Sequence, residues 1–295
     1  MENNHDKAFQ PELVRQQTTR TRQEFAVESA VEAACNGHPE ALDAIAPKLA
    51  GFTKAQFHEI CQASVHTLSL IAAAADRGHP EALQAVAPQL AIFSKKDLYE
   101  ICQASAYTLN NIACAASEGH PAALDAIAPK LASFTVEQLQ GICQASAHTL
   151  NNIACATSEG HPAALDAIAP KLAGFPADQF QGICQASRHT LSNIACAASE
   201  GHQEALNVIV PQLASFAAAH FQEICQVSAH PLHNIAYAAS KGHTDALDAI
   251  APKIGRFPLA LLHGICQASA HTLSFIAVAA SEGHPDALNS IAPKL

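Results

Sequence analysis

The chain has 295 residues, of which 49% are hydrophobic and 14% are charged, and this composition is typical of a folded protein rather than a disordered one. Acidic residues outnumber basic ones by 26 to 16, which gives a formal net charge of −10. Because binding to a phosphate backbone depends on Lys and Arg, this balance disfavours nucleic acid and favours a basic or neutral partner.

The sequence contains no run of eighteen or more apolar residues and no apolar stretch near its start. We therefore expect no transmembrane helix, no signal peptide and no membrane partner, and we expect the protein to be cytoplasmic where it is made. The 17 histidines qualify the charge argument, because their protonation below about pH 6.5 removes much of the negative charge.

The first part of the chain differs from the rest. Residues 1–24 are polar and match no later segment, so we predict a flexible polar tail. Residues 25–51 contain the segment Gly37–Leu42, whose Gly-His-Pro pattern recurs further along the chain. We predict that residues 25–51 form a half-repeat that caps the N-terminal end.

A period of 41 residues runs through residues 52–295 without slips. Columns of identical Phe, His and Pro mark it, as in Phe52, Phe93 and Phe134. A fixed period of this length is the signature of stacked helical units. We predict an all-α, right-handed α-solenoid of six tandem 41-residue repeats, which start at residues 52, 93, 134, 175, 216 and 257, plus the N-terminal half-repeat.

Residues 134–174 illustrate the three short helices that we expect in each repeat. The first follows the capping candidate Thr135, the second begins near His148, and the third carries Pro162 in its first turn. We expect a glycine to end the second helix and Pro170 to kink or end the third. The histidine after that glycine is expected to make a turn or capping contact.

Six of the ten cysteines recur at the same period, and we expect them to form a column of buried, reduced thiols. They are Cys61, Cys102, Cys143, Cys184, Cys225 and Cys266. The spacing of five between Cys143 and His148 matches no common structural zinc signature, so we expect no metal site.

The sequence carries none of the common catalytic or nucleotide-binding motifs that we sought. An enzyme needs an asymmetric set of side chains, whereas a repeated sequence supplies identical columns. We therefore expect neither catalytic activity nor a cofactor.

The segment Leu191–Ala195, Leu-Ser-Asn-Ile-Ala, resembles a segment of armadillo and HEAT solenoids and recurs in variant form at Leu109–Ala113 and Leu150–Ala154. In armadillo proteins an asparagine in this setting lines the concave groove and holds the main chain of an extended peptide. The resemblance implies a non-enzymatic scaffold that binds an extended, basic protein segment along a concave surface.

Two further likenesses imply a different partner. Leu109–Asn111, Gly119-His120 and Phe134 with Gln138 are similar to octotricopeptide repeats, which bind RNA in organelles. Ser117-Glu118 occupies the place of the base-reading pair in repeats that resemble those of TAL effectors. These likenesses imply the alternative function, modular binding of single-stranded RNA or DNA at about one nucleotide per repeat.

Candidate binding residues follow from variation among the repeats, since residues that hold repeats together should be identical. The primary candidates lie on or beside the second helix: Asn110, Asn111, Asn151, Asn152, Arg188, Ser192, Asn193, His233 and Asn234. At 100° per residue Asn111 points away from the apolar stripe of its helix, and its amide has the chemistry that a peptide groove requires. The alternative is structural: a solenoid helix is often buried on two sides, and the asparagine then caps the neighbouring turn.

A second column of candidates stands at the start of the second helix: His66, Tyr107, His148, His189, His230 and His271. These side chains either offer polar and stacking contacts to a ligand or make a hydrogen bond at the helix start.

The chain stops at Leu295 without a polar capping repeat, so we expect that the apolar C-terminal end self-associates, binds a partner or belongs to a longer array. Near-identical arrays also resemble those of bacterial effectors, which implies delivery into a host cell.

Overall fold

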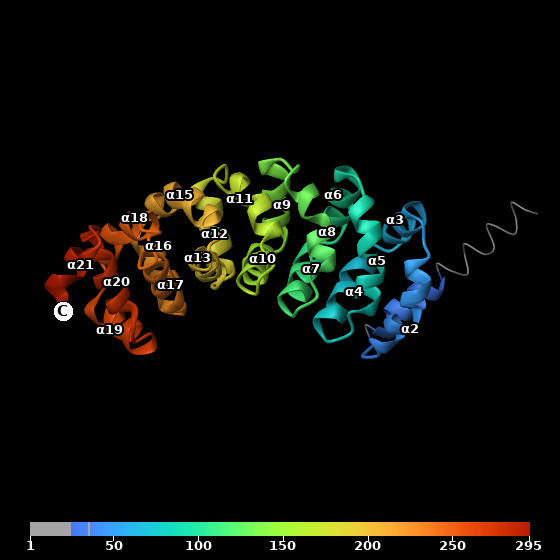
Figure 1. The fold of residues 1–295 in the computed structure, drawn as a ribbon, viewed down its shortest axis with the longest axis horizontal. Coiled ribbons are helices and arrows are strands. Elements are labelled where there is room, and N and C mark those ends of the chain that lie inside the picture. Colours follow the sequence, from blue (N-terminus) through green and yellow to red (C-terminus); the bar gives the residue numbers. More distant parts are fainter. Residues whose placement is uncertain (1–24, 35) are drawn as a thin grey trace, which may run out of the picture.

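The computed structural model describes residues 25–34 and 36–295, and every regular element within them is a helix (Figure 1). The all-α class is therefore confirmed. The predicted tail, residues 1–24, lies outside the described residues.

Each 41-residue unit contributes a first, a second and a third helix. The first helices are α3 (Lys54–Ala63), α6 (Lys95–Ala104), α9 (Val136–Ala145), α12 (Ala177–Ala186), α16 (Ala218–Val227) and α19 (Leu259–Ala268). The second helices are α4 (Thr67–Asp76), α7 (Thr108–Ser117), α10 (His148–Ser158), α13 (Thr190–Ser199), α17 (His230–Ala239) and α20 (Thr272–Ser281).

The third helices begin with α2 (Glu40–Ala50), which follows a helix over residues 25–34. The others are α5 (Glu81–Ile92), α8 (Ala122–Leu131), α11 (Ala163–Leu172), the pair α14 (Glu204–Val208) and α15 (Val210–Ser215), α18 (Asp245–Ile254), and α21 (Asp286–Ile291) with the short 3₁₀ helix Ala292–Lys294.

The first helices of the earlier units begin at a capping box, as predicted for Thr135. The Oγ1 atom of Thr135 accepts from the backbone N–H of Gln138 at 3.2 Å, and Oε1 of Gln138 accepts from the backbone N–H of Thr135 at 3.0 Å. Two otherwise unpaired N–H groups are thereby satisfied. In later units this position is Pro176, Ala217 or Pro258, and the side-chain cap is absent there.

A glycine with positive φ ends each second helix, as predicted. Gly160 has a φ of +95°, and the N–H of His161 returns to the carbonyl of Ala156 at 2.9 Å. This is the bond pattern of a Schellman C-cap, which favours glycine because a Cβ is strained at that φ. The same geometry recurs at Gly37, Gly78, Gly119, Gly201, Gly242 and Gly283.

In most units the third helix runs past its proline instead of ending there. Pro170 lies inside α11, which continues to Leu172. Its missing N–H removes one helical hydrogen bond, the one to the carbonyl of Asp166, and the last turn of α11 forms without it. The third helix breaks near Pro211, where α14 and α15 meet at Ile209, and near Pro293, where α21 gives way to the 3₁₀ helix Ala292–Lys294.

Equivalent helices of successive units pack against each other. Second helix contacts second helix from α4 to α20, and third helix contacts third helix from α2 to α21. Figure 1 shows the result as an arch with α4, α7, α10 and α13 along its inner side. Leu150, Ile153 and Ala154 of α10 are fully buried between neighbours, so each unit depends on the next for its core.

The predicted cysteine column is confirmed. Cys61, Cys102, Cys143, Cys184 and Cys225 are free and buried, and Cys266 is free and half-buried. Burial raises the pKa of Cys143 to about 12, so its thiol stays protonated and packs as a small apolar side chain.

A polar link also joins several third helices to the preceding unit. Nε2 of the buried Gln212 lies within 3.0–3.2 Å of three carbonyl oxygens, those of Leu172, Ala173 and Phe175. Gln89 does the same three units earlier, and Lys253 occupies the equivalent position with Nζ 2.9 Å from the carbonyl of Ala214. These amides and ammonium groups satisfy carbonyls at a helix end that have no partner within the helix.

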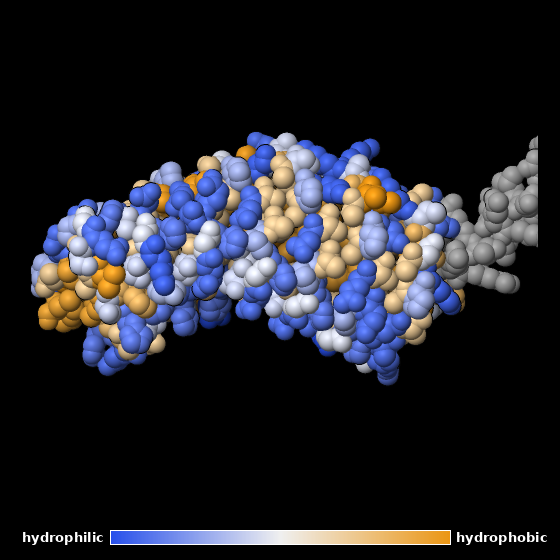
Figure 2. All heavy atoms as spheres, in the orientation of Figure 1, coloured by the Kyte–Doolittle hydropathy of each residue, from blue (hydrophilic) through white to orange (hydrophobic). Residues whose placement is uncertain are grey.

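Apolar surface gathers at the C-terminal end of the arch, over α19 to α21 (Figure 2). Leu259 and Leu295 are exposed there, and Leu273 is only half-buried, whereas its equivalent Leu150 is fully buried. In the preceding units a following unit covers this face. Among the described residues no single helix is long and apolar enough to cross a membrane; α19 and α20 meet the criterion only as a pair bent by 99°.

We predict that Gln212→Leu lowers the free energy of unfolding by about 1–3 kcal/mol, because buried carbonyls lose their donor. Urea unfolding followed by circular dichroism measures the change. Gln212→Lys is the matched control, since Lys253 makes the equivalent bond, and it should cost less. An equal loss in both variants would contradict the assigned role of the donor.

Candidate functional site

The candidate asparagines lie between successive second helices and are half-buried. Nδ2 of Asn152 on α10 donates to Oδ1 of Asn110 on α7 at 3.1 Å, and Nδ2 of Asn193 on α13 donates to Oδ1 of Asn151 at 3.1 Å. Within α10, Asn151 donates to Oδ1 of Asn152 at 2.9 Å. The amides thus form a chain of hydrogen bonds that crosses from unit to unit.

Serines accept from asparagine at the start of this chain and in a separate contact between α17 and α13. Nδ2 of Asn111 lies 3.0 Å from both the carbonyl oxygen and Oγ of Ser69, and Asn234 contacts the carbonyl and Oγ of Ser192 at 3.1 and 2.9 Å. These amides therefore bond to the second helix of the preceding unit instead of capping a turn, and the sequence did not indicate this structural use. It leaves each asparagine fewer unused donors and acceptors for a ligand than the sequence suggested.

The asparagine chain ends at α17. The next unit has Phe275 in place of an asparagine, and its ring lies 4.9 Å from that of Tyr237 and 5.4 Å from that of His233, between ring centres. Nδ1 of His233 lies 3.1 Å from Oγ1 of Thr272 instead of meeting an amide. An aromatic contact here replaces the polar link of the earlier units.

The second candidate column, here called the junction column, is exposed along its whole length: His66, Tyr107, His148, His189, His230 and His271. The predicted hydrogen bond at the helix start is wrong where the residue is the N-cap, because no side-chain cap bond forms there, as at His66, Tyr107 and His189. These residues have backbone angles in the helical region, which turns the side chain away from the free N–H groups. The rings project to solvent.

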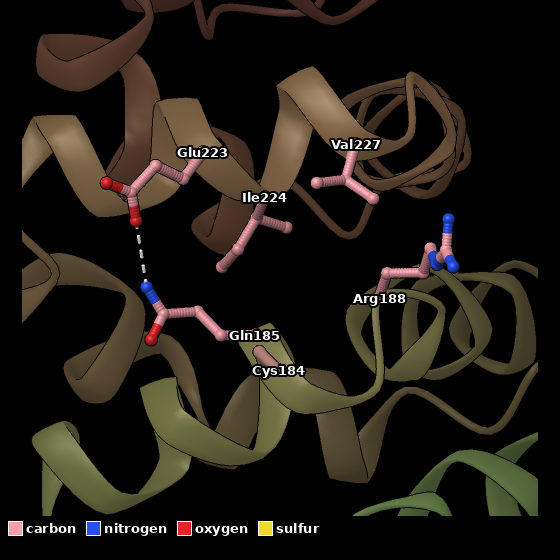
Figure 3. A pocket seen from close by; sticks show the side chains of 6 residues that line it. All are labelled: Cys184, Gln185, Arg188, Glu223, Ile224 and Val227. Carbon is pink, nitrogen blue, oxygen red and sulfur yellow. Dashed lines mark hydrogen bonds between the residues drawn. The ribbon is translucent and has the colours of Figure 1, made fainter.

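Arg188 lies beside the junction column. It is exposed, and burial together with the positive charges of Arg188 and His230 lowers the pKa of His189. Arg188 also lines a hollow of about 200 Å³ between α12 and α16, with Gln185, Glu223 and Val227 around it (Figure 3). The structure therefore brings Arg188 and the junction column together and places the asparagines in a separate, interhelical position.

One exposed column was missed by the sequence analysis. It contains Gln62, Gln103, Gln144, Gln185, Gln226 and Gln267, one at the end of each first helix. The signal was present, because a residue that is identical in every unit and yet lies on the surface has no packing role. It was overlooked because identity was taken to mark the interior.

Glutamates occupy the opposite end of the second helices. Glu118, Glu159 and Glu200 are exposed C-cap residues of α7, α10 and α13. The carbonyl end of a helix is itself partly negative, so these glutamates strengthen a local acidic edge. Lys241 occupies the equivalent position after α17.

The turn histidines make the expected backbone contact, and some of them make a second contact that the sequence did not indicate. Nδ1 of His79 lies 2.8 Å from Oδ2 of Asp43, and Nδ1 of His284 lies 2.7 Å from Oδ2 of Asp248. Each aspartate belongs to the third helix of the preceding unit. These pairs stabilise the stacking of units rather than form a ligand site.

Within the described part of the chain, no group of three or more His, Cys, Asp or Glu side chains is arranged to hold a metal ion. Half-buried cysteines of the second helices, such as Cys114 and Cys155, have pKa values raised first by burial. Thiols in this state are poor metal ligands and poor nucleophiles.

The fold and these contacts define a class, an all-helical protein in which equivalent helices of successive units pack in tandem. No protein-family model matches the chain, and no curated protein matches it either.

We predict that Asn152→Ala lowers the free energy of unfolding by about 1–2 kcal/mol, because it leaves the amides of Asn110 and Asn151 with unpaired groups. Chemical unfolding measures it. Asn151→Ser is the matched control, since Ser69 and Ser192 act as acceptors at that position. A purely ligand-binding asparagine would leave stability unchanged.

Stability should also depend on pH through His233. Burial first, and then the positive charges of His230 and His271, lower its pKa. As the pH falls below about 6.5, the unfolded chain therefore binds more protons than the folded chain. The contribution of neutral His233 to the free energy of unfolding is present above that pH and is lost below it. We predict that His233→Asn reduces the loss of stability between about pH 7.5 and about pH 5.5.

Thermal unfolding at the two pH values tests this prediction, with the exposed His148→Asn as control. The substitution to Asn is tolerated in other units, which carry Asn110 and Asn151 at this position. An undiminished pH dependence in His233→Asn would refute the role of this side chain.

Proposed function

We propose that this chain is a non-enzymatic repeat scaffold that binds an extended, basic protein segment along the inner side of the arch. The observation that supports it most is the recurrence of exposed groups on the second helices, with the junction column at their starts and glutamates at their ends. A periodic surface of this kind suits a partner that is itself extended and repeats its backbone contacts.

The spacing supports an extended partner. Packed helices lie about 8–10 Å apart, and an extended chain advances about 3.3 Å per residue, so each unit corresponds to about three residues of the segment. The exposed glutamine amides, as at Gln144, and the rings of the junction column, as at His148, can bind the backbone groups of the segment. Side chains of every third residue then meet equivalent places on successive units.

Charge supports a basic segment. Glu118, Glu159 and Glu200 line the acidic edge of the inner helices, and part of the basic side chains is already engaged within the fold. Lys130 and Lys253 donate to backbone carbonyls of the preceding unit, and Lys54 pairs with Asp97 at 2.7 Å. Complementary charge raises the association rate and makes it sensitive to salt.

We also propose a handedness, a number of repeats and a type for the solenoid. We take the chain to be a right-handed solenoid of six repeats with an N-terminal half-repeat, of the armadillo/HEAT type. The tandem packing of equivalent helices supports it. The exposed apolar surface over α19 to α21 further supports self-association through that end. Delivery into a host cell remains an expectation based on resemblance alone.

One observation favours the alternative, binding of single-stranded nucleic acid. The junction column presents exposed rings at regular intervals, including Tyr107 with 60% of its surface exposed, and rings of this kind stack on bases. The acidic edge on the same helices opposes a phosphate backbone. We therefore place nucleic acid second.

The test is fluorescence anisotropy with two pools of labelled random peptides of about 18 residues, three for each of six units, one pool rich in Lys and the other rich in Glu. We predict salt-sensitive binding of the Lys-rich pool. The combined variant Glu118→Gln, Glu159→Gln, Glu200→Gln should weaken it about tenfold, as expected for three rim ion pairs that together contribute about 1.4 kcal/mol.

The matched control, Glu81→Gln, Glu137→Gln, Glu204→Gln, removes the same charge from exposed residues in first turns of other helices and should retain binding. Failure of the Lys-rich pool to bind, together with salt-sensitive binding of random single-stranded RNA, would replace the proposal with the nucleic-acid alternative. Equal weakening of binding in both variants would show that the peptide responds to the net charge of the protein and not to the positions of Glu118, Glu159 and Glu200.

A further inference from the structure

Hollows recur between neighbouring first helices. The hollow between α12 and α16 has a volume of about 200 Å³ and includes Gln185, Ile224 and Val227. A second one, of about 240 Å³, lies between α6 and α9 at equivalent positions, which include Gln103 and Ile142. Each has room for a side chain of several atoms rather than for a single water molecule.

The α12–α16 hollow differs chemically from the rest of the array. At the position of Arg188 the other units have Val65, Ala106, Ala147, Ala229 and Ala270. At the position of Val227 they have Ala63, Ala104, Ala145, Ala186 and Ala268. Two departures from an otherwise regular sequence therefore meet at one place, and both side chains lie on the hollow (Figure 3).

Among the described residues, Arg188 has no acidic partner. Its side chain makes no hydrogen bond or ion pair with any described residue, and in Figure 3 it projects from the end of α12 on the side of the hollow opposite Glu223. Glu223 is engaged elsewhere, because its Oε2 accepts from Nε2 of Gln185 at 3.0 Å. The guanidinium thus keeps its five donors for a group that comes from outside the chain.

We propose that the hollow between α12 and α16 is a specificity pocket that takes one acidic side chain of the bound protein segment. The carboxylate pairs with Arg188 in the bidentate geometry that favours Arg over Lys. The methylene groups of that side chain rest on Ile224 and Val227, which supply the apolar part of the lining. This inference rests on the proposed function and names the residue type that fixes the position of the segment.

The charges favour a carboxylate on a peptide over the phosphates of a nucleic acid. Glu223 lies across the same hollow, so a polyanion that ran past Arg188 would meet repulsion there. A segment that is basic over α7, α10 and α13 and carries one acidic residue next to this stretch can pair with the glutamates of these helices and with Arg188. The pocket therefore also fixes the direction in which the segment runs.

The experiment selects binders from a phage-displayed library of random peptides of about 18 residues. We expect peptides that bind the wild-type chain to share Asp or Glu at one position beside a basic stretch. Arg188→Ala should lose this preference, and Arg188→Glu should replace it with Lys or Arg. Ala106→Arg should add a second acidic position about six residues away, because Ala106 and Arg188 stand two units apart.

The selected consensus peptide and its Glu→Gln analogue provide a quantitative cycle. The wild-type chain should bind the consensus about tenfold more tightly, and Arg188→Ala should bind both equally. Arg256→Ala is the matched control, since Arg256 is exposed and lies away from the hollow, and it should keep the tenfold preference. Alanine is the residue of other units at position 188, so Arg188→Ala leaves the fold intact.

An acidic preference that persists in Arg188→Ala, or peptides that bind without any such preference, would overturn the pocket and leave the proposed scaffold function standing. Absence of any enriched peptide would overturn both. Binding of random single-stranded RNA that is lost in Arg188→Ala would assign the guanidinium to phosphate instead.

Discussion

The close approach of successive second helices determines every other contact between the units. Ala113, Ala154, Ala195 and Ala236 are fully buried at equivalent positions, and their small side chains allow neighbouring backbones to come near each other. At that separation the short side chain of an asparagine spans the gap from one helix to the next, as Asn152 does. A larger residue at the alanine position would separate the helices and with them the exposed groups that the units present in a row.

Local signals predicted the helices well, because they act within a few residues. The cap at Thr135 and the turn at Gly160 follow from backbone chemistry that needs no neighbour. Pro170 was misjudged because its effect depends on where the helix ends and on the packing that holds the last turn. The α14–α15 break at Ile209 shows that the same residue type acts differently when its neighbours change.

The candidate site was harder to predict, since periodicity gives the direction of a side chain but not what lies there. Asn111 does point away from its own apolar stripe, yet the space it enters is filled by Ser69 of the preceding unit. Identity among units was also an unreliable guide. Internal duplication copies surface and interior alike, so the exposed glutamines, such as Gln144, are as uniform as the core.

The polar links between units have a mechanical consequence. Gln212 to Leu172, Asn152 to Asn110 and His79 to Asp43 all join residues 36 to 42 positions apart, which is one unit and no more. A force that pulls on the two ends of the molecule is therefore carried in series, from each interface to the next. Such a chain extends like a spring while its interfaces hold, and it yields by peeling one unit at a time at its weakest interface.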